Sequence, residues 1–256
     1  MSKGGKLVMD PVDGLTAVIR VEWRKHVWPG GDPPGIRLLV AALVSLLLGV
    51  ALPAVLRRPW MEVPQMIFMW AYIPLFLLGD MVTATFGSER GTEVAKECPN
   101  AFASEDVVFF GKLALPVLYA LAVFCGTLIL GGVTTGLTYA GDWLPPAFSR
   151  VGFYVVLCVL LAYEAMAGIA AFFSLQSWGH RAGGWIVRGI LIVPLASMVT
   201  VLLISGGSPL DTLFSAFVDA GIGQIVFGVV APLALLDFTS LIIARSAFHR
   251  GRHDPM

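Results

Sequence analysis

The sequence predicts an all-α membrane protein with six transmembrane helices, because it is poor in charge and contains long apolar segments. Of its 256 residues, 57% are hydrophobic and only 13% are charged, whereas a soluble domain carries about a quarter charged residues. So few charges cannot cover a folded surface of this size, and we expect lipid to surround much of the chain. Since the backbone must satisfy its own hydrogen bonds in lipid, long apolar runs are expected to be helices.

Six apolar segments are long enough to cross a bilayer, which takes about 20 residues. Several tryptophans fall near the ends of these segments, where amphipathic rings favour the level of the lipid headgroups. The segments make up a transmembrane domain over residues 36–245, and a tail over 246–256 follows it. The predicted spans are Ile36–Leu56, Val63–Thr85, Leu113–Leu137, Val151–Leu175, Trp185–Ser205 and Ile222–Ala244.

The Lys and Arg residues indicate how the spans are oriented. All of them except Arg57, Arg58 and Arg150 lie in or beside the N-terminal region, the 87–111 loop, the loop around Arg181 or the tail. Cytoplasmic loops carry the excess of basic residues, so we expect both termini to be cytoplasmic. The formal net charge is zero, which gives no reason to expect a nucleic-acid partner.

Residues 1–35 form a cytoplasmic N-terminal region with one predicted helix. From Val12 to Trp28 the apolar residues fall within a broad arc at about 100° per residue. This pattern indicates an elbow helix that lies in the membrane interface, although Glu22 interrupts its apolar arc. A disordered basic tail is the alternative. Residues 29–34, rich in proline and glycine, then turn the chain into the first span.

Two of the loops carry further predicted helices. In the cytoplasmic 87–111 loop, Glu89, Glu93 and Glu97 recur every four residues, which places them on one face of a helix. Residues 208–220, between the fifth and sixth spans, begin with Ser-Pro and an acidic first turn, and their apolar residues keep helical spacing. This segment is too short to cross the bilayer, so we expect a half-inserted helix on the external side.

Sequence motifs for catalysis are absent. The chain has no GxxxxGK[ST] phosphate-binding loop, no GxSxG or HExxH motif, and no paired Cys/His spacing typical of a metal site. We therefore expect neither an enzyme nor a metal or cofactor bound by this chain. An energised function would have to draw on a partner or on an ion gradient.

Three acidic residues lie inside the predicted spans: Asp80, Glu164 and Asp237. Ionisable groups in a membrane are costly and rare, so each is a candidate for a cargo path or a proton path. The structural alternative is that they pair with polar neighbours or, for Asp80, reach the headgroups. The fourth span also has a face of small residues that would allow close helix packing, either within the chain or between two copies. That face contains Ala165, Ala167, Gly168 and Ala171.

The elbow helix, the six spans and the long loop between spans two and three resemble the permease subunits of type-2 ABC exporters. The most specific match is the segment at 86–92, which reads Phe-Gly-Ser-Glu-Arg-Gly-Thr, together with the later Pro99 and Gly111-Lys112. Glu22-Trp23-Arg24-Lys25 looks like the elbow helix of the family, and 208–220 is similar to its re-entrant element.

The sequence departs from the family pattern inside the 87–111 loop. Glu93 follows Thr92 directly, where the family usually has an apolar residue and then Glu, and Pro99 comes one place early. The loop helix is therefore expected to be one residue shorter than in the family, which weakens the role of Glu93 more than the resemblance itself.

The resemblance implies a permease subunit of an ATP-driven exporter in the prokaryotic cytoplasmic membrane. Its 87–111 loop would be a coupling helix that docks on a separate ABC ATP-binding subunit, and that subunit would hold ATP and Mg²⁺. A second permease copy, identical or similar, would complete the complex, and the cargo would move by alternating access. The sparse charge of the spans, rather than the resemblance, indicates a lipophilic or amphiphilic cargo. The residues implied in coupling are Glu89, Arg90, Glu93 and Glu97.

Two functions of other classes stay open at this point. A proton-coupled secondary transporter would use Glu164 and Asp237 and would need no ATPase. A membrane scaffold or assembly factor would move no cargo and would tolerate neutralisation of the buried acids.

Overall fold

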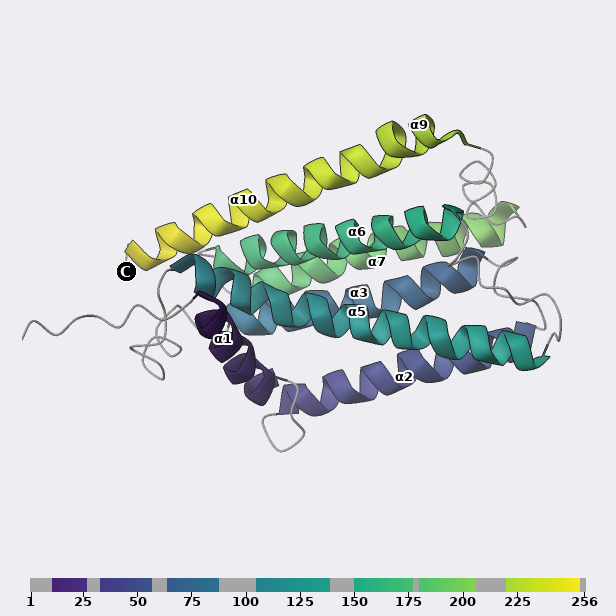
Figure 1. Cartoon of the computed structure of the whole chain (residues 1–256), viewed down its shortest axis with the longest axis horizontal. Helices are drawn as coiled ribbons and strands as arrows, with labels where there is room; N and C mark the ends of the chain where they lie inside the picture. The colour runs from purple at the N-terminus through teal and green to yellow at the C-terminus, as the bar shows by residue number, and fades with distance from the viewer. Residues whose placement is uncertain are drawn as a thin grey trace, which may run out of the picture.

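The computed structural model describes residues 11–26, 33–56, 64–87, 105–138, 150–176, 180–205 and 220–253, and these residues form helices and no strand. The predicted all-α class is therefore confirmed for the described part of the chain. In Figure 1, the long helices run side by side along the length of the molecule. The elements are α1 (Pro11–His26), α2 (Pro33–Leu56), α3 (Pro64–Gly87), α5 (Glu105–Thr138), α6 (Arg150–Leu175), α7 (His180–Ser205), α9 (Ile222–Ile225), the π-helix η3 (Val226–Val230) and α10 (Ala231–His253).

Three helical stretches in the described residues are long and apolar enough to cross a membrane. They are Glu105–Gly131, Val156–Leu175 and Ile222–Arg250, and shorter apolar stretches lie at Leu38–Ala51, Trp70–Phe86 and Ala182–Val193. Apart from Val63, all residues of the six predicted spans lie in described helices. The expectation that the long apolar runs are helical is thus confirmed, and three of the helices have the length and composition of membrane spans.

The helix starts follow from local sequence. α2 and α3 each begin at a proline, whose fixed φ suits the first turn and whose missing N–H would be unpaired there in any case. α5 begins with Glu105 and Asp106, whose negative charges complement the positive end of the helix dipole. Pro74 and Pro116 lie inside α3 and α5 without ending either helix.

The main core lies among α3, α5, α6 and α7, where Trp70, Phe109, Phe124, Tyr163 and Val187 are buried. In this core a large side chain packs directly against a glycine. The Trp70 ring packs so closely on α5 that a Cβ at Gly131 would lie 2.4 Å from it.

α2 is attached to α5 by polar contacts within an apolar interface. Ser45 and Thr127 hydroxyls lie 3.3 Å apart, and the Tyr119 hydroxyl donates to the Leu38 carbonyl at 3.0 Å. A Cβ at Gly49 would lie 2.8 Å from the Thr127 side chain, so the glycine permits this close approach.

α6 and α10 cross closely at Gly168, where an added Cβ would lie 2.5 Å from Ser240 Oγ and 2.9 Å from the backbone of the same residue. Ala165, Ala167 and Ala171 on α6 are buried as well. The predicted small-residue face is therefore used for packing within the chain.

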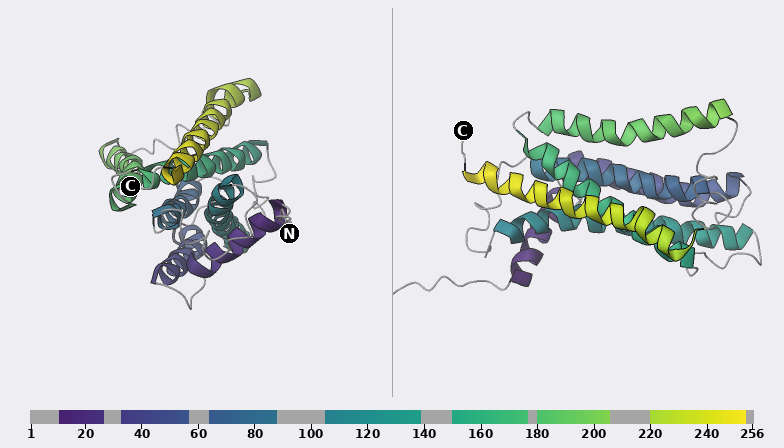
Figure 2. Two further views of the ribbon diagram at one scale, coloured as in Figure 1. Left: turned by 90° about the vertical axis from the view of Figure 1, so that its left-hand side faces the viewer. Right: turned by 90° about the horizontal axis from the view of Figure 1, so that it is seen from above.

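α1 lies across one end of the bundle, the same end at which α10 finishes (Figures 1 and 2). The sequence predicted a helix over Val12–Trp28, and the structure has one over Pro11–His26. The coupling helix predicted in the 87–111 loop falls mostly outside the described residues, as do Glu89, Arg90, Glu93 and Glu97. The external helix predicted over 208–220 also lies outside them, except for Ala220.

Candidate functional site

The segment 88–104, which lies outside the described residues, carries the coupling residues expected from the sequence, and the structure describes the residues on either side of it. The segment leaves α3 at Gly87 and returns to the helix bundle at Glu105, the first residue of α5. α1 and the last turns of α10 pack around this point. We call this region, where α1, α3, α5 and α10 meet, the junction.

A buried ion pair lies at the centre of the junction. Lys112 Nζ on α5 is 3.2 Å from Glu22 Oε1 on α1, and the two side chains are only 3% and 0% exposed. The same ammonium group lies 3.4 Å from the Thr85 carbonyl oxygen near the end of α3, to which it donates. A buried charge is costly unless it is paired and hydrogen-bonded. Lys112 therefore links three helices at one atom.

The register of α1 on α5 explains how this ion pair forms. A Cβ at Gly111 would lie 2.8 Å from Val18 Cβ and 3.4 Å from a methyl group of Leu15. Only a glycine at 111 lets α1 approach so closely. Glu22 is four residues beyond Val18 and so lies on the same face of α1, which brings its carboxylate to Lys112, the residue after Gly111.

Aromatic side chains form the second layer of the junction. Phe86, Phe109 and Phe248 come from α3, α5 and α10, and their ring centroids lie 5.6 to 6.1 Å apart. Lys112 Nζ lies 5.9 Å from the centroid of the Phe86 ring, within the range of a cation–π contact. The end of α10 is thereby packed against the end of α3 and the start of α5.

The outer edge of the junction is polar. Arg245 on α10 donates to both carboxylate oxygens of Asp106 at 2.7 Å each. His249 places Nδ1 2.6 Å from Glu105 and Nε2 3.0 Å from Asp106. Within the described residues, no group of three or more His, Cys, Asp or Glu side chains could hold a metal ion.

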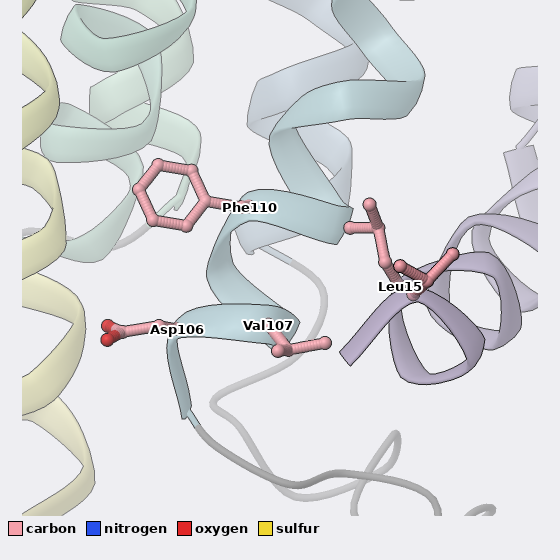
Figure 3. Close-up of a pocket in the computed structure, with 5 residues that line it drawn as sticks. Leu15, Asp106, Val107 and Phe110 are labelled. Carbon is pink, nitrogen blue, oxygen red and sulfur yellow. The ribbon is translucent and has the colours of Figure 1, made fainter. Parts of the chain in front are cut away.

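A shallow cavity of about 250 Å³ opens between α1 and α5, lined by Val12, Leu15, Asp106, Val107 and Phe110. Figure 3 shows that Leu15 points from α1 toward α5, while Asp106 points away toward α10. Since Asp106 is engaged by Arg245 and His249, apolar side chains form most of the cavity wall. These lining residues offer no set of polar groups for a cofactor.

Two of the acids predicted from the sequence meet between α6 and α10. The carboxyl groups of Glu164 and Asp237 lie close enough to influence each other. Two neighbouring carboxylates repel each other unless one of them takes up a proton. Glu164 is exposed and Asp237 is partly buried, so the pair lies at the surface of the α6–α10 interface.

The third acid has a different partner. Asp80 Oδ1 accepts a hydrogen bond of 3.0 Å from Arg188 Nε on α7, and the Arg188 guanidinium lies 5.6 Å from the Trp185 ring centroid. The structure thus separates Asp80 from the pair of Glu164 and Asp237. Asp80 pairs instead with Arg188, a contact that no local pattern in the sequence indicates.

In comparisons with known proteins, no protein-family model, curated protein or solved structure matches the chain.

Proposed function

We propose that the chain is the six-span permease subunit of an ATP-driven exporter of the ABC type, with both termini in the cytoplasm. The observation that carries this proposal is the construction of the junction. Motif residues on the two sides of the segment 88–104 come together in space, since Phe86 and Lys112 are in contact although they lie 26 positions apart in the sequence. They surround the place from which a coupling helix would project.

In this function the partner subunit binds ATP and Mg²⁺, and the permease converts movement of the partner into movement of its spans. Glu89, Arg90, Glu93 and Glu97 would dock on the ATPase. Opposite charges across such an interface would determine register and partner choice more than affinity. Because α3 and α5 both begin or end at the junction, a displacement of the segment 88–104 would reach two spans together.

A complete exporter would contain two permeases, either two copies of this chain or this chain with a similar one, in a prokaryotic cytoplasmic membrane. The cargo class that fits the sparsely charged helices is lipophilic or amphiphilic. The long helices with exposed apolar side chains support a lipid environment for the chain.

Purification from the native membrane tests this proposal. The tagged chain is extracted in a mild detergent, and co-purifying proteins are identified by mass spectrometry. We expect a stoichiometric soluble subunit with a phosphate-binding loop, which the triple variant E89A/R90A/E97A loses while staying folded. Recovery of a monodisperse chain without such a subunit would contradict the proposal.

The acid pair favours a second candidate, a proton-coupled secondary transporter. Glu164 and Asp237 approach each other between two helices, and intramembrane acids are common elements of proton relays. In that case transport would depend on the proton gradient and would be lost in both E164Q and D237N. In the exporter, transport would follow ATP and would survive D237N.

A further inference from the structure

The buried pair of Glu22 and Lys112 has a consequence for the N-terminal helix. α1 precedes the first predicted span, and nothing in the proposed exporter mechanism requires it to move with the segment 88–104. Yet Lys112, at the start of α5, contacts both α1 and the end of α3 through one charged atom.

We infer that Lys112 holds α1, the end of α3 and the start of α5 as one mechanical unit, so that a displacement of the segment 88–104 also displaces α1. Lys112 is a positioning residue in this account, because it acts through the helices that it joins. Lys112 would have this role whichever partner binds the segment 88–104.

The geometry makes the unit depend on two separate contacts of Lys112. The contact with Glu22 holds α1, and it is dry, since both side chains are almost fully buried. The contact with the Thr85 carbonyl holds the last turn of α3 against α5. The two contacts can be distinguished, since a change at Glu22 breaks only the first, whereas removal of the ammonium group breaks both.

The close crossing at Gly111 explains why the ion pair is needed. The crossing gives α1 a tight apolar contact at Val18, but it also carries the Glu22 carboxylate into a site closed to water. Without Lys112 that carboxylate would lose the positive charge beside it. Its removal from water would then favour an outward movement of α1.

Cysteine labelling of the full chain in nanodiscs tests the inference. In a background without Cys98, Cys125 and Cys158, single cysteines replace Val18 on α1 or Thr85 on α3, which are both fully buried. The rate of reaction with a maleimide then reports how often each site opens. The variants compared are E22Q, K112M and the double variant E22M/K112M.

We expect E22Q to raise the labelling rate at position 18 about tenfold or more and to leave position 85 unchanged. K112M should raise the rate at both positions. In E22M/K112M two apolar side chains fill the site, so position 18 should be protected again while position 85 stays reactive. T127V, which removes the α2–α5 hydroxyl contact elsewhere on α5, should change neither rate.

Protection of both positions in K112M would overturn the inference, as would equal exposure of both positions in E22Q. If K112M proves too unstable to purify, E22M/K112M decides alone, and protection of position 85 in that variant would contradict the role of Lys112. Since no ATPase takes part in this assay, its outcome is independent of whether the chain is a permease.

Discussion

Glu22 is the residue at which the apolar face of the N-terminal helix is interrupted, and it is also fully buried. A carboxylate can occupy such a site only with a partner, and Lys112 lies 3.2 Å away. The interruption of the pattern therefore marks the contact by which α1 joins the bundle. Glu22 therefore identifies the face by which α1 packs on α5 more directly than the apolar residues around it.

Replacement of Lys112 by Met is expected to lower the free energy of unfolding by about 3–5 kcal/mol, because it removes the positive charge that is paired with the buried Glu22 carboxylate. Thermal or denaturant unfolding in detergent measures the effect. The matched control is R245Q, which breaks the exposed pair with Asp106 and should cost less than about 1 kcal/mol. Equal effects of the two variants would contradict the buried character of the Glu22–Lys112 pair.

The acid pair makes a second prediction at the scale of residues. An amide at position 237 can donate to the Glu164 carboxylate and removes the repulsion between two acids, so D237N should keep the stability of the chain. D237A leaves Glu164 without a polar neighbour at this position and should cost about 1–2 kcal/mol. If D237N destabilises the chain as much as D237A, position 237 makes no polar contact with Glu164.

At the scale of elements, glycine positions decide how closely the helices approach. Gly168 lets α6 meet α10, Gly111 lets α1 meet α5, and Gly131 accommodates Trp70. Each of these contacts would require a backbone or a large side chain to shift if a Cβ were present. The arrangement of the helices thus depends on a few small residues.

G168V is therefore expected to destabilise the chain by about 1–3 kcal/mol, since the added atoms would force α6 and α10 apart. Gly189 on α7 provides the control, because nothing lies within 4 Å of the place of its Cβ. G189A should be neutral or should stabilise the chain by up to about 1 kcal/mol through its higher helix propensity. Unfolding curves of both variants in the same detergent would show the contrast, and a harmless G168V would refute the close crossing.

The helices themselves could be predicted from the sequence, because each apolar run and each helix start is a local signal. The fold class and the approximate bounds of α1, α2, α3, α5, α6, α7 and α10 follow from such signals. The small-residue face of α6 was also visible, although its partner, α10, was not.

The candidate site was harder to predict, because its contacts join distant parts of the chain. In the sequence, Lys112 belongs to a motif and Glu22 interrupts an apolar pattern. Their pairing depends on the crossing at Gly111, which no local pattern shows. In the same way, the separation of Asp80 from Glu164 and Asp237 depends on which helices are neighbours. The sequence gives no signal that Arg188 pairs with Asp80, because Arg188 lies near the end of an apolar run.

At the scale of the whole molecule, the described helices form one elongated bundle with α1 and the end of α10 at the same end (Figure 1). Side chains such as Leu235, Phe238 and Ile242 on α10 are exposed and apolar, as expected for a surface in contact with lipid. This arrangement agrees with a membrane protein.

The proposed six-span topology predicts the location of fused reporters. Green fluorescent protein after residue 256 should fluoresce, because it matures in the cytoplasm. Alkaline phosphatase inserted between residues 206 and 219 should be active, because that loop would be external. An active phosphatase at the C-terminus would contradict an even number of spans with a cytoplasmic N-terminus.

Site-specific photo-crosslinking tests the central claim most directly. A benzophenone amino acid at position 93 or 97 is irradiated in native membranes, and the adduct is identified by mass spectrometry, with position 204 on α7 as a control that should not reach a soluble partner. The account predicts an adduct at 93 or 97 with a soluble subunit that carries a phosphate-binding loop. Adducts only with lipid or with unrelated proteins at both positions would contradict the proposal that this chain is the permease of an ATP-driven exporter.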